Sequence, residues 1–131
     1  LTPIPPVSDD ELVEIHRKNE LAHRYFEDRH ISSINLVSAH SQIARALELV
    51  SKRQVPKDLK MEVTGLAKDI EGQLQQTVQK LEDEMTNQIK LQLHYEAIKN
   101  AEQLVKLYRE SDYIKRGRVI ALMEQLKSKK I

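Results

Sequence analysis

The chain has 131 residues, of which 40% are hydrophobic and 31% charged, and its net charge is +1. This length fits one domain, and four Tyr and one Phe without Trp leave a mainly aliphatic core. Without cysteine there is no disulfide, thiolate metal ligand or thiol nucleophile, which favours a cytoplasmic or nuclear location. No apolar run approaches the roughly 20 residues that span a bilayer. The first residue is not Met, so we expect a fragment of a longer protein.

Residues 1–7 form a proline-rich segment, for which we expect an extended leader. Three of the four prolines of the chain lie in it. Proline fixes the backbone dihedral φ and favours an extended, polyproline-like linker. The remaining residues, 8–131, are expected to form a single helical bundle domain.

A first helical arm is expected from Asp9 to about Arg53. Ser8 and Glu11 have the spacing of a capping box, in which each side chain bonds the backbone amide of the other residue. Apolar residues then recur every three to four positions without an intervening glycine or proline, which is typical of a buried helical stripe. The stripe weakens around Ser32. The arm either breaks there or continues as one helix with a partly hydrated middle.

Pro56 predicts a sharp chain reversal, followed by a second arm from Asp58 to about Arg109. Proline ends the preceding helix and suits the first turn of the next one. The apolar stripe of the second arm has a period close to eleven residues, which keeps it facing one partner helix. Beyond Ile89 a second apolar row widens this stripe. Its members are Leu91, Tyr95, Ile98 and Val105.

A widened apolar face needs more than one neighbour, so we expect a third helix after Ser111 and Asp112. Its expected apolar face consists of Ile114, Val119, Ile120, Met123 and Leu126. The predicted fold is therefore all-α: an elongated antiparallel helical hairpin plus a shorter C-terminal helix. This three-helix arrangement becomes a four-helix bundle if the first arm breaks near Ser32.

No residue pattern indicates a catalytic, cofactor-binding or metal-binding site. His16, His23 and His30 are seven residues apart, so on a helix they share a face but lie about 10 Å from one another, too far to share a metal. The chain also lacks a glycine-rich phosphate loop, an HExxH motif and a nucleophile elbow. We therefore predict no enzymatic activity, no cofactor, no metal and no small-molecule substrate.

The C-terminal segment is basic, with six Lys or Arg against two Asp or Glu in residues 111–131. Cations near a helix C-terminus complement the helix dipole, and they also suit an acidic partner or phosphates. Tyr113 is the only aromatic residue in this segment, so a stacking platform for bases is missing. Nucleic-acid binding is kept only as a further alternative.

The stretch Val55-Pro56-Lys57-Asp58-Leu59 between two helical segments resembles the first turn of BAG domains, and Ile114-Lys115-Arg116 with Val119-Ile120 is similar to their third helix. The resemblance implies a three-helix co-chaperone that accelerates nucleotide exchange on Hsp70. Tyr113 and Glu124 stand where the family offers Arg and Gln to the chaperone. The second helical segment is also about four turns longer than in that family.

The function expected from these patterns is helix-against-helix binding by a scaffold, adaptor or complex subunit. The expected partner is another protein helix or a second copy of the chain. The partner-binding residues are those of the second apolar row, Leu91, Tyr95, Ile98 and Val105, because the other row already faces the first arm.

Overall fold

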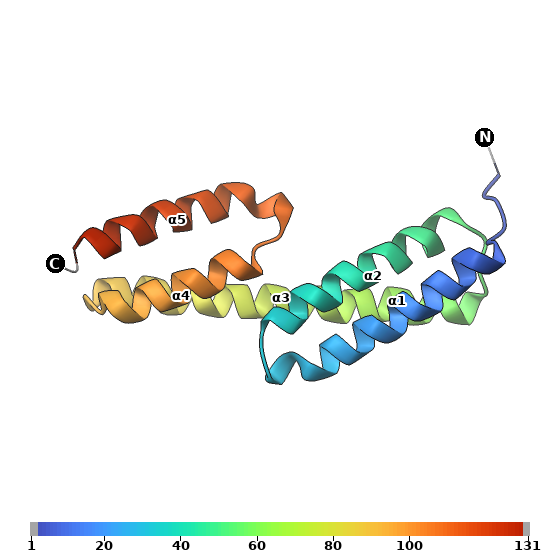
Figure 1. Cartoon of the computed structure of the whole chain (residues 1–131), viewed down its shortest axis with the longest axis horizontal. Coiled ribbons are helices and arrows are strands. Elements are labelled where there is room, and N and C mark those ends of the chain that lie inside the picture. Colours follow the sequence, from blue (N-terminus) through green and yellow to red (C-terminus); the bar gives the residue numbers. More distant parts are fainter. Residues whose placement is uncertain (1–2, 130–131) are drawn as a thin grey trace. The chain divides into compact units, whose positions relative to one another are not determined.

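The computed structural model describes residues 3–129, which fold into helices joined by short loops (Figure 1). The predicted all-α class is confirmed, since 85% of the structure is helical and the described residues contain no strand. The helices are α1 (Asp9–Glu27), α2 (Ile34–Lys52), α3 (Lys57–Lys90), α4 (His94–Leu107) and α5 (Tyr113–Ser128). Two short 3-10 turns, η1 (Asp28–His30) and η2 (Glu110–Asp112), lie between them. No helix among the described residues is long and apolar enough to cross a membrane.

Internal contacts divide the chain into two compact units, Leu1–Gln73 (unit 1) and Leu74–Ile131 (unit 2). Unit 1 contains α1, α2 and the first half of α3, and unit 2 contains the second half of α3, α4 and α5. The expectation of one domain over residues 8–131 stays a prediction.

The N-terminus of α1 has the capping box predicted from the sequence. The amide of Glu11 donates to the Ser8 hydroxyl at 3.1 Å, and the amide of Ser8 donates to the Glu11 carboxylate, also at 3.1 Å. The Glu11 carboxylate also accepts from Nε of Arg53 at the end of α2. The Ser8 amide first, and then Arg53, hold the pKa of Glu11 below its usual value. One cap thus fixes where α1 starts and joins it to α2.

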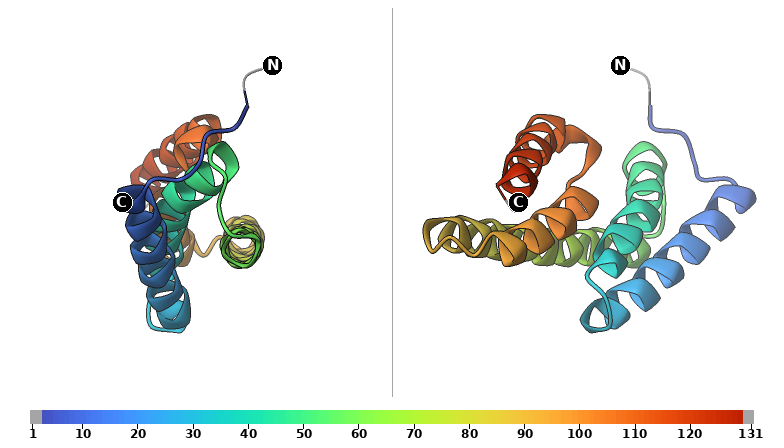
Figure 2. Two further views of the ribbon diagram at one scale, coloured as in Figure 1. Left: turned by 90° about the vertical axis from the view of Figure 1, so that its right-hand side faces the viewer. Right: turned by 60° about the vertical axis from the view of Figure 1, so that its left-hand side comes forward.

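The first arm breaks near Ser32, as one of the two sequence-based alternatives expected. α1 ends at Glu27, η1 follows, and α2 starts at Ile34. The side-chain amide of Asn35 donates to the Asp28 carbonyl oxygen at 2.9 Å across this connection. α2 then returns alongside α1 (Figures 1 and 2).

The reversal predicted at Pro56 is confirmed. α2 ends at Lys52 and α3 begins at Lys57, so that Ile43 of α2 joins Val63 and Ile70 of α3 in one buried cluster. The core of unit 1 consists of aliphatic side chains from α1, α2 and α3: Ile15, Ala22, Ala39, Ile43, Ala46, Leu49, Val50, Leu59, Val63, Leu66 and Ile70.

The proline-rich leader is extended from residue 3 onward and is tied to the α2–α3 turn. The Gln54 amide donates to the Pro5 carbonyl at 2.8 Å, and the Val7 amide donates to the Gln54 carbonyl at 3.1 Å. The Gln54 side chain donates to the Ile4 carbonyl at 2.8 Å. Leu1 and Thr2 lie outside the described residues.

The second arm is not one helix, which corrects the expectation of a continuous helix to about Arg109. α3 ends at Lys90 and α4 starts at His94, so the three residues 91–93 form a turn. The sequence contains no glycine or proline here, and the apolar period runs across the turn without a visible interruption.

Backbone hydrogen bonds at this turn show how α3 ends. Gln92 adopts a left-handed conformation with φ of 60°. The Leu93 amide bonds the Gln88 carbonyl at 2.8 Å, and the Gln92 amide bonds the Ile89 carbonyl at 3.0 Å. This pair of bonds is a Schellman motif, with glutamine at the position that glycine usually occupies.

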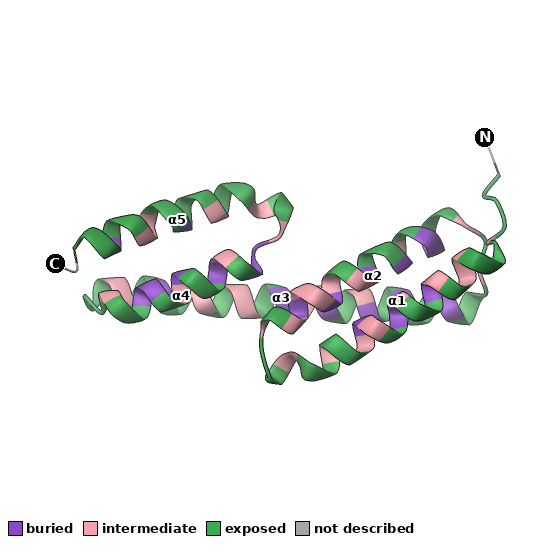
Figure 3. Ribbon diagram, in the orientation of Figure 1, coloured by how far each residue is buried: buried purple, intermediate pink, exposed green. Residues whose placement is uncertain are grey.

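Unit 2 has its own buried cluster, built from α3, α4 and α5. Its members are Met85, Ala97, Ile98, Ala101, Leu104, Tyr108, Val119 and Leu126. The third helix expected after Asp112 is present as α5. Of its expected apolar face, Val119, Met123 and Leu126 pack inward, whereas Ile114 and Ile120 are exposed. Figure 3 shows the alternation of buried and exposed turns along each helix.

Candidate interaction surfaces

The four residues predicted to bind a partner do not lie on one helical face. Leu91 is in the α3–α4 turn with 61% of its surface exposed, and Tyr95 is 52% exposed in the first turn of α4. Ile98 is only 5% exposed and belongs to the core of unit 2. Val105 is partly buried against the same core. The turn separates the row because it changes the chain direction after Lys90.

The turn exposes one further apolar side chain that sequence analysis did not select. Leu93 is 43% exposed, so that Leu91, Leu93 and Tyr95 form an exposed apolar segment, here called the α3–α4 turn surface. Lys99 Nζ lies 4.8 Å from the centre of the Tyr95 ring, a cation–π contact. Hydrogen bonding to Tyr95 raises the pKa of Lys99. This contact restrains the ring on α4.

Tyr108 is the main polar group inside unit 2. It follows α4 directly, is buried, and its hydroxyl donates to Oε2 of Glu82 on α3 at 2.7 Å. Burial, together with the bond to Glu82, raises the pKa of Tyr108 well above its ordinary value. The bond satisfies the hydroxyl, as buried polar groups require, and joins the end of α4 to α3.

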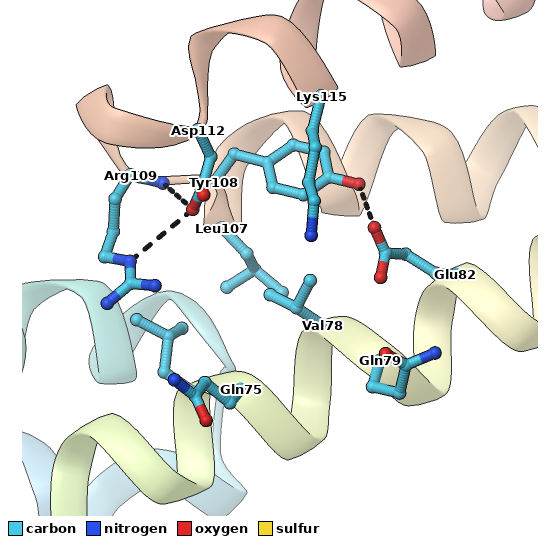
Figure 4. A pocket seen from close by; sticks show the side chains of 10 residues that line it. Gln75, Val78, Gln79, Glu82, Leu107, Tyr108, Arg109, Asp112 and Lys115 are labelled. Carbon is cyan, nitrogen blue, oxygen red and sulfur yellow. Dashed lines mark hydrogen bonds and ion pairs between the residues drawn. The ribbon is translucent and has the colours of Figure 1, made fainter. Parts of the chain in front are cut away.

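A cavity of about 250 Å³ lies beside Tyr108 (Figure 4). Its charged lining is mixed in sign: Glu82, Arg109, Asp112 and Lys115. Nε of Arg109 lies 3.5 Å from Oδ2 of Asp112, and Glu82 already accepts from Tyr108. These two pairs engage Arg109, Asp112, Tyr108 and Glu82 within unit 2.

The basic residues of α5 divide into a structural group and exposed groups. Arg116 donates to the carbonyl oxygens of Tyr108 at 3.0 Å and Arg109 at 3.2 Å. It therefore bonds two backbone carbonyls just after the end of α4, and that of Arg109 also accepts from the Asp112 amide at 2.9 Å. The exposed cations of the described part of α5 and its C-cap are Lys115, Arg118, Lys127 and Lys129. Lys130, part of the predicted basic segment, lies outside the described residues.

The histidines that stand seven apart do not converge. His16 and His30 are exposed, and Nε2 of His23 lies 3.8 Å from Glu62 on α3. A second such pair, which the sequence did not indicate, joins His40 on α2 to Glu71 on α3 at 3.5 Å. Residues 3–129 contain no group of three or more His, Asp or Glu side chains placed to hold a metal ion.

These features define an all-α protein with two compact helical units and exposed apolar side chains on helix ends and outer faces. Comparison with family models, curated proteins and solved structures found no match.

Proposed function

We propose that the chain is a non-enzymatic helical interaction module of a larger scaffold, adaptor or complex, and that it works in the cytoplasm or nucleus. Its partner is a protein helix or a second copy of the chain. The observation that supports this is the α3–α4 turn surface, where Leu91, Leu93 and Tyr95 are all exposed. Apolar surface left in water costs about 25 cal/mol per Å², which favours burial against a partner.

The buried members of the predicted row support this surface from beneath. Ile98 anchors α4 to the core of unit 2 and Val105 packs against that core, so the first turn of α4 is held on a packed base. A rigid base lowers the entropy lost when exposed side chains bind a partner. Leu91 and Tyr95 therefore remain the residues proposed to contact the partner.

Substitution of both contact residues tests the proposal. We expect Leu91→Glu/Tyr95→Glu to abolish association in sedimentation equilibrium over a concentration series, while circular dichroism stays helical. Ile98 is left intact because it is buried in the core of unit 2. The matched control is Val13→Glu/Tyr25→Glu, which changes two exposed apolar residues of α1. Equal association of both variants and the parent chain would refute a role for the turn surface.

Two alternatives from other functional classes have direct assays. A BAG-like co-chaperone accelerates nucleotide release from Hsp70, and a scaffold does not. A nucleic-acid binder that uses the exposed cations of α5 loses affinity steeply with salt. We expect neither behaviour. Arg116 is engaged in a hydrogen bond to the Tyr108 carbonyl at the end of α4, and the described part of α5 has no platform on which bases could stack.

A further inference from the structure

The connection between α2 and α3, residues 53–56 and here called the α2–α3 linker, contacts the leader in the way that an edge strand contacts a neighbouring strand. Arg53 is extended, with φ of −130° and ψ of 157°. Gln54 forms a parallel β-bridge with Pro6 of the leader, at the end of unit 1 where α1 starts (Figure 1). Two extended segments thus pair here, an arrangement that is called β-augmentation when they come from different chains.

The linker binds the main chain of the leader. The Gln54 amide donates to the Pro5 carbonyl oxygen, the Gln54 side chain donates to the Ile4 carbonyl oxygen, and the Gln54 carbonyl accepts from the Val7 amide. Val7 also packs against the core of unit 1. Proline has no N–H, so it fits the two positions before Val7, whereas the position of Val7 requires an aliphatic residue that can donate.

The exposure of the leader indicates that it can leave the linker. Residues 3–6 are exposed, and Val7 is only half-buried. Exposed hydrogen bonds give little net stability because water replaces them, and the entropy lost on ordering an extended segment opposes them. Proline lowers this entropy cost because its φ is already fixed. The same advantage belongs to any competing segment that contains proline.

The start of α1 is fixed by contacts that do not involve the leader. Ser8 and Glu11 form the capping box, and the Glu11 carboxylate also accepts from Nε of Arg53. These bonds begin at Ser8, directly after the leader. When the leader detaches, the cap therefore still holds α1 beside the end of α2, and the backbone groups of the linker become available.

We propose that the α2–α3 linker is a docking site for an extended, proline-containing segment of a partner protein, and that the chain's own leader occupies this site until the partner displaces it. The supporting observation is that the site already holds a segment of this chemistry. A tethered leader has an effective concentration on the order of millimolar, so the partner segment must bind more tightly than a weak ligand. This inference goes beyond the helix binding proposed above and involves none of the α3–α4 turn surface.

The contacts of the linker disfavour other occupants. A helix pairs its backbone groups internally, so it cannot use the amide and carbonyl of Gln54 as an extended segment does. The leader of a second copy has the right sequence, but Val7 is followed directly by the cap of α1. Exchange of leaders between two copies would therefore need a hinge where the chain has no free residue.

Titration with a peptide tests the site on the whole chain. The probe is an acetylated and amidated peptide with the sequence of residues 3–8, and binding is followed by NMR of the labelled protein. The variant Pro5→Gly/Val7→Ser loosens the leader, because it raises the entropy of the free leader and removes its apolar contact. We expect the probe to bind this variant at least about tenfold more tightly than the parent, because apparent affinity falls with the fraction of protein whose site is already occupied.

Changes to single hydrogen bonds test how the site binds the probe. An ester in place of the valine amide of the probe removes the N–H and keeps the side chain, and we expect affinity for the loosened variant to fall by about two- to tenfold. Gln54→Pro, added to the loosened variant, removes two donors and should weaken binding at least about tenfold. Arg53 is already extended, as the residue before proline must be. The milder Gln54→Ala should also weaken binding, whereas its matched control Gln76→Ala, at an exposed glutamine of unit 2, should not.

Several results would overturn the proposal. They are the absence of saturable binding to the loosened variant up to about 10 mM probe, equal affinity of the parent and the loosened variant, and equal affinity of the amide and ester probes. Self-association of the parent that Gln54→Pro abolishes would also overturn it, because the occupant would then be the leader of a second copy. Leu91→Glu/Tyr95→Glu should leave the probe affinity unchanged, so failure of the α3–α4 turn surface shows separately from failure of the linker site.

Discussion

Tyr108 couples the stability of unit 2 to pH through a single buried hydroxyl. Its ring lies in the cluster of α3, α4 and α5 side chains, and its O–H points to the Glu82 carboxylate. A phenolate at this position could no longer donate a hydrogen bond to Glu82, and its negative charge would lie beside that of the Glu82 carboxylate. For this reason the neutral form is favoured in the folded protein and the pKa of Tyr108 is raised.

The sign of the pH dependence follows from this shift. A raised pKa means that the contribution of Tyr108 to stability is complete below its ordinary pKa of about 10 and is lost as pH rises further. We expect Tyr108→Phe to lower the free energy of unfolding by about 1–2 kcal/mol at pH 7 and to lose less stability than the parent above pH ~10. Urea unfolding at both pH values measures this.

The control for Tyr108 is Tyr113→Phe, which changes an exposed phenol. Its unfolding free energy should follow that of the parent at each pH. If the free energy of unfolding of the parent and of Tyr108→Phe falls equally above pH ~10, the pH dependence belongs to other groups, above all the lysines.

At the scale of helices, the end of α3 depends on a residue poorly suited to its conformation. Gln92 has φ of 60°, where a Cβ atom costs roughly 1 kcal/mol and glycine is free of this cost. We expect Gln92→Gly to raise the free energy of unfolding by about 0.5–1 kcal/mol, as measured by urea denaturation. The Schellman bonds of Gln92 and Leu93 should persist, since they involve only the backbone.

The same substitution, glutamine to glycine, should lower the free energy of unfolding when it is made inside a helix. Gln103 lies within α4, so Gln103→Gly should destabilise by about 1 kcal/mol. If Gln92→Gly destabilises by a similar amount, the turn at residues 91–93 is absent and α3 continues into α4, as the apolar period of the sequence suggests.

Local chemistry explains which elements could be predicted from the sequence. Ser8 and Glu11 predict the start of α1 because the capping box is a short-range motif. Pro56 predicts the turn between α2 and α3 because proline cannot continue a helix. The α3–α4 turn has no such marker. Its left-handed residue is a glutamine, and the apolar period passes through it unchanged.

The missed turn also explains why the candidate site was predicted only in part. A continuous helix would place Leu91, Tyr95 and Ile98 on one face, whereas the turn exposes the first two and buries the third. The side of α3 that meets α2 could not be predicted either, because it depends on the packing of Ile43 with Val63 and Ile70, which lie far from Ile43 along the chain.

At the scale of the whole molecule, each unit has a hydrophobic cluster of its own, and α3 contributes to both. Leu104 is fully buried in unit 2 and Leu49 is nearly so in unit 1. Truncation of a buried leucine to alanine typically costs about 2–5 kcal/mol. The two sites therefore make it possible to weaken either unit with the same chemical change.

We expect Leu104→Ala to speed amide hydrogen exchange in α4, α5 and the second half of α3, and to leave α1 and α2 protected, because local stability follows the cluster that is weakened. Leu49→Ala should give the reciprocal pattern. Exchange followed by mass spectrometry resolves the two units. If either substitution reduces protection equally along the whole chain, residues 8–131 unfold as one cooperative domain, as composition and length alone predict, and the continuity of α3 then outweighs the separation of the two clusters.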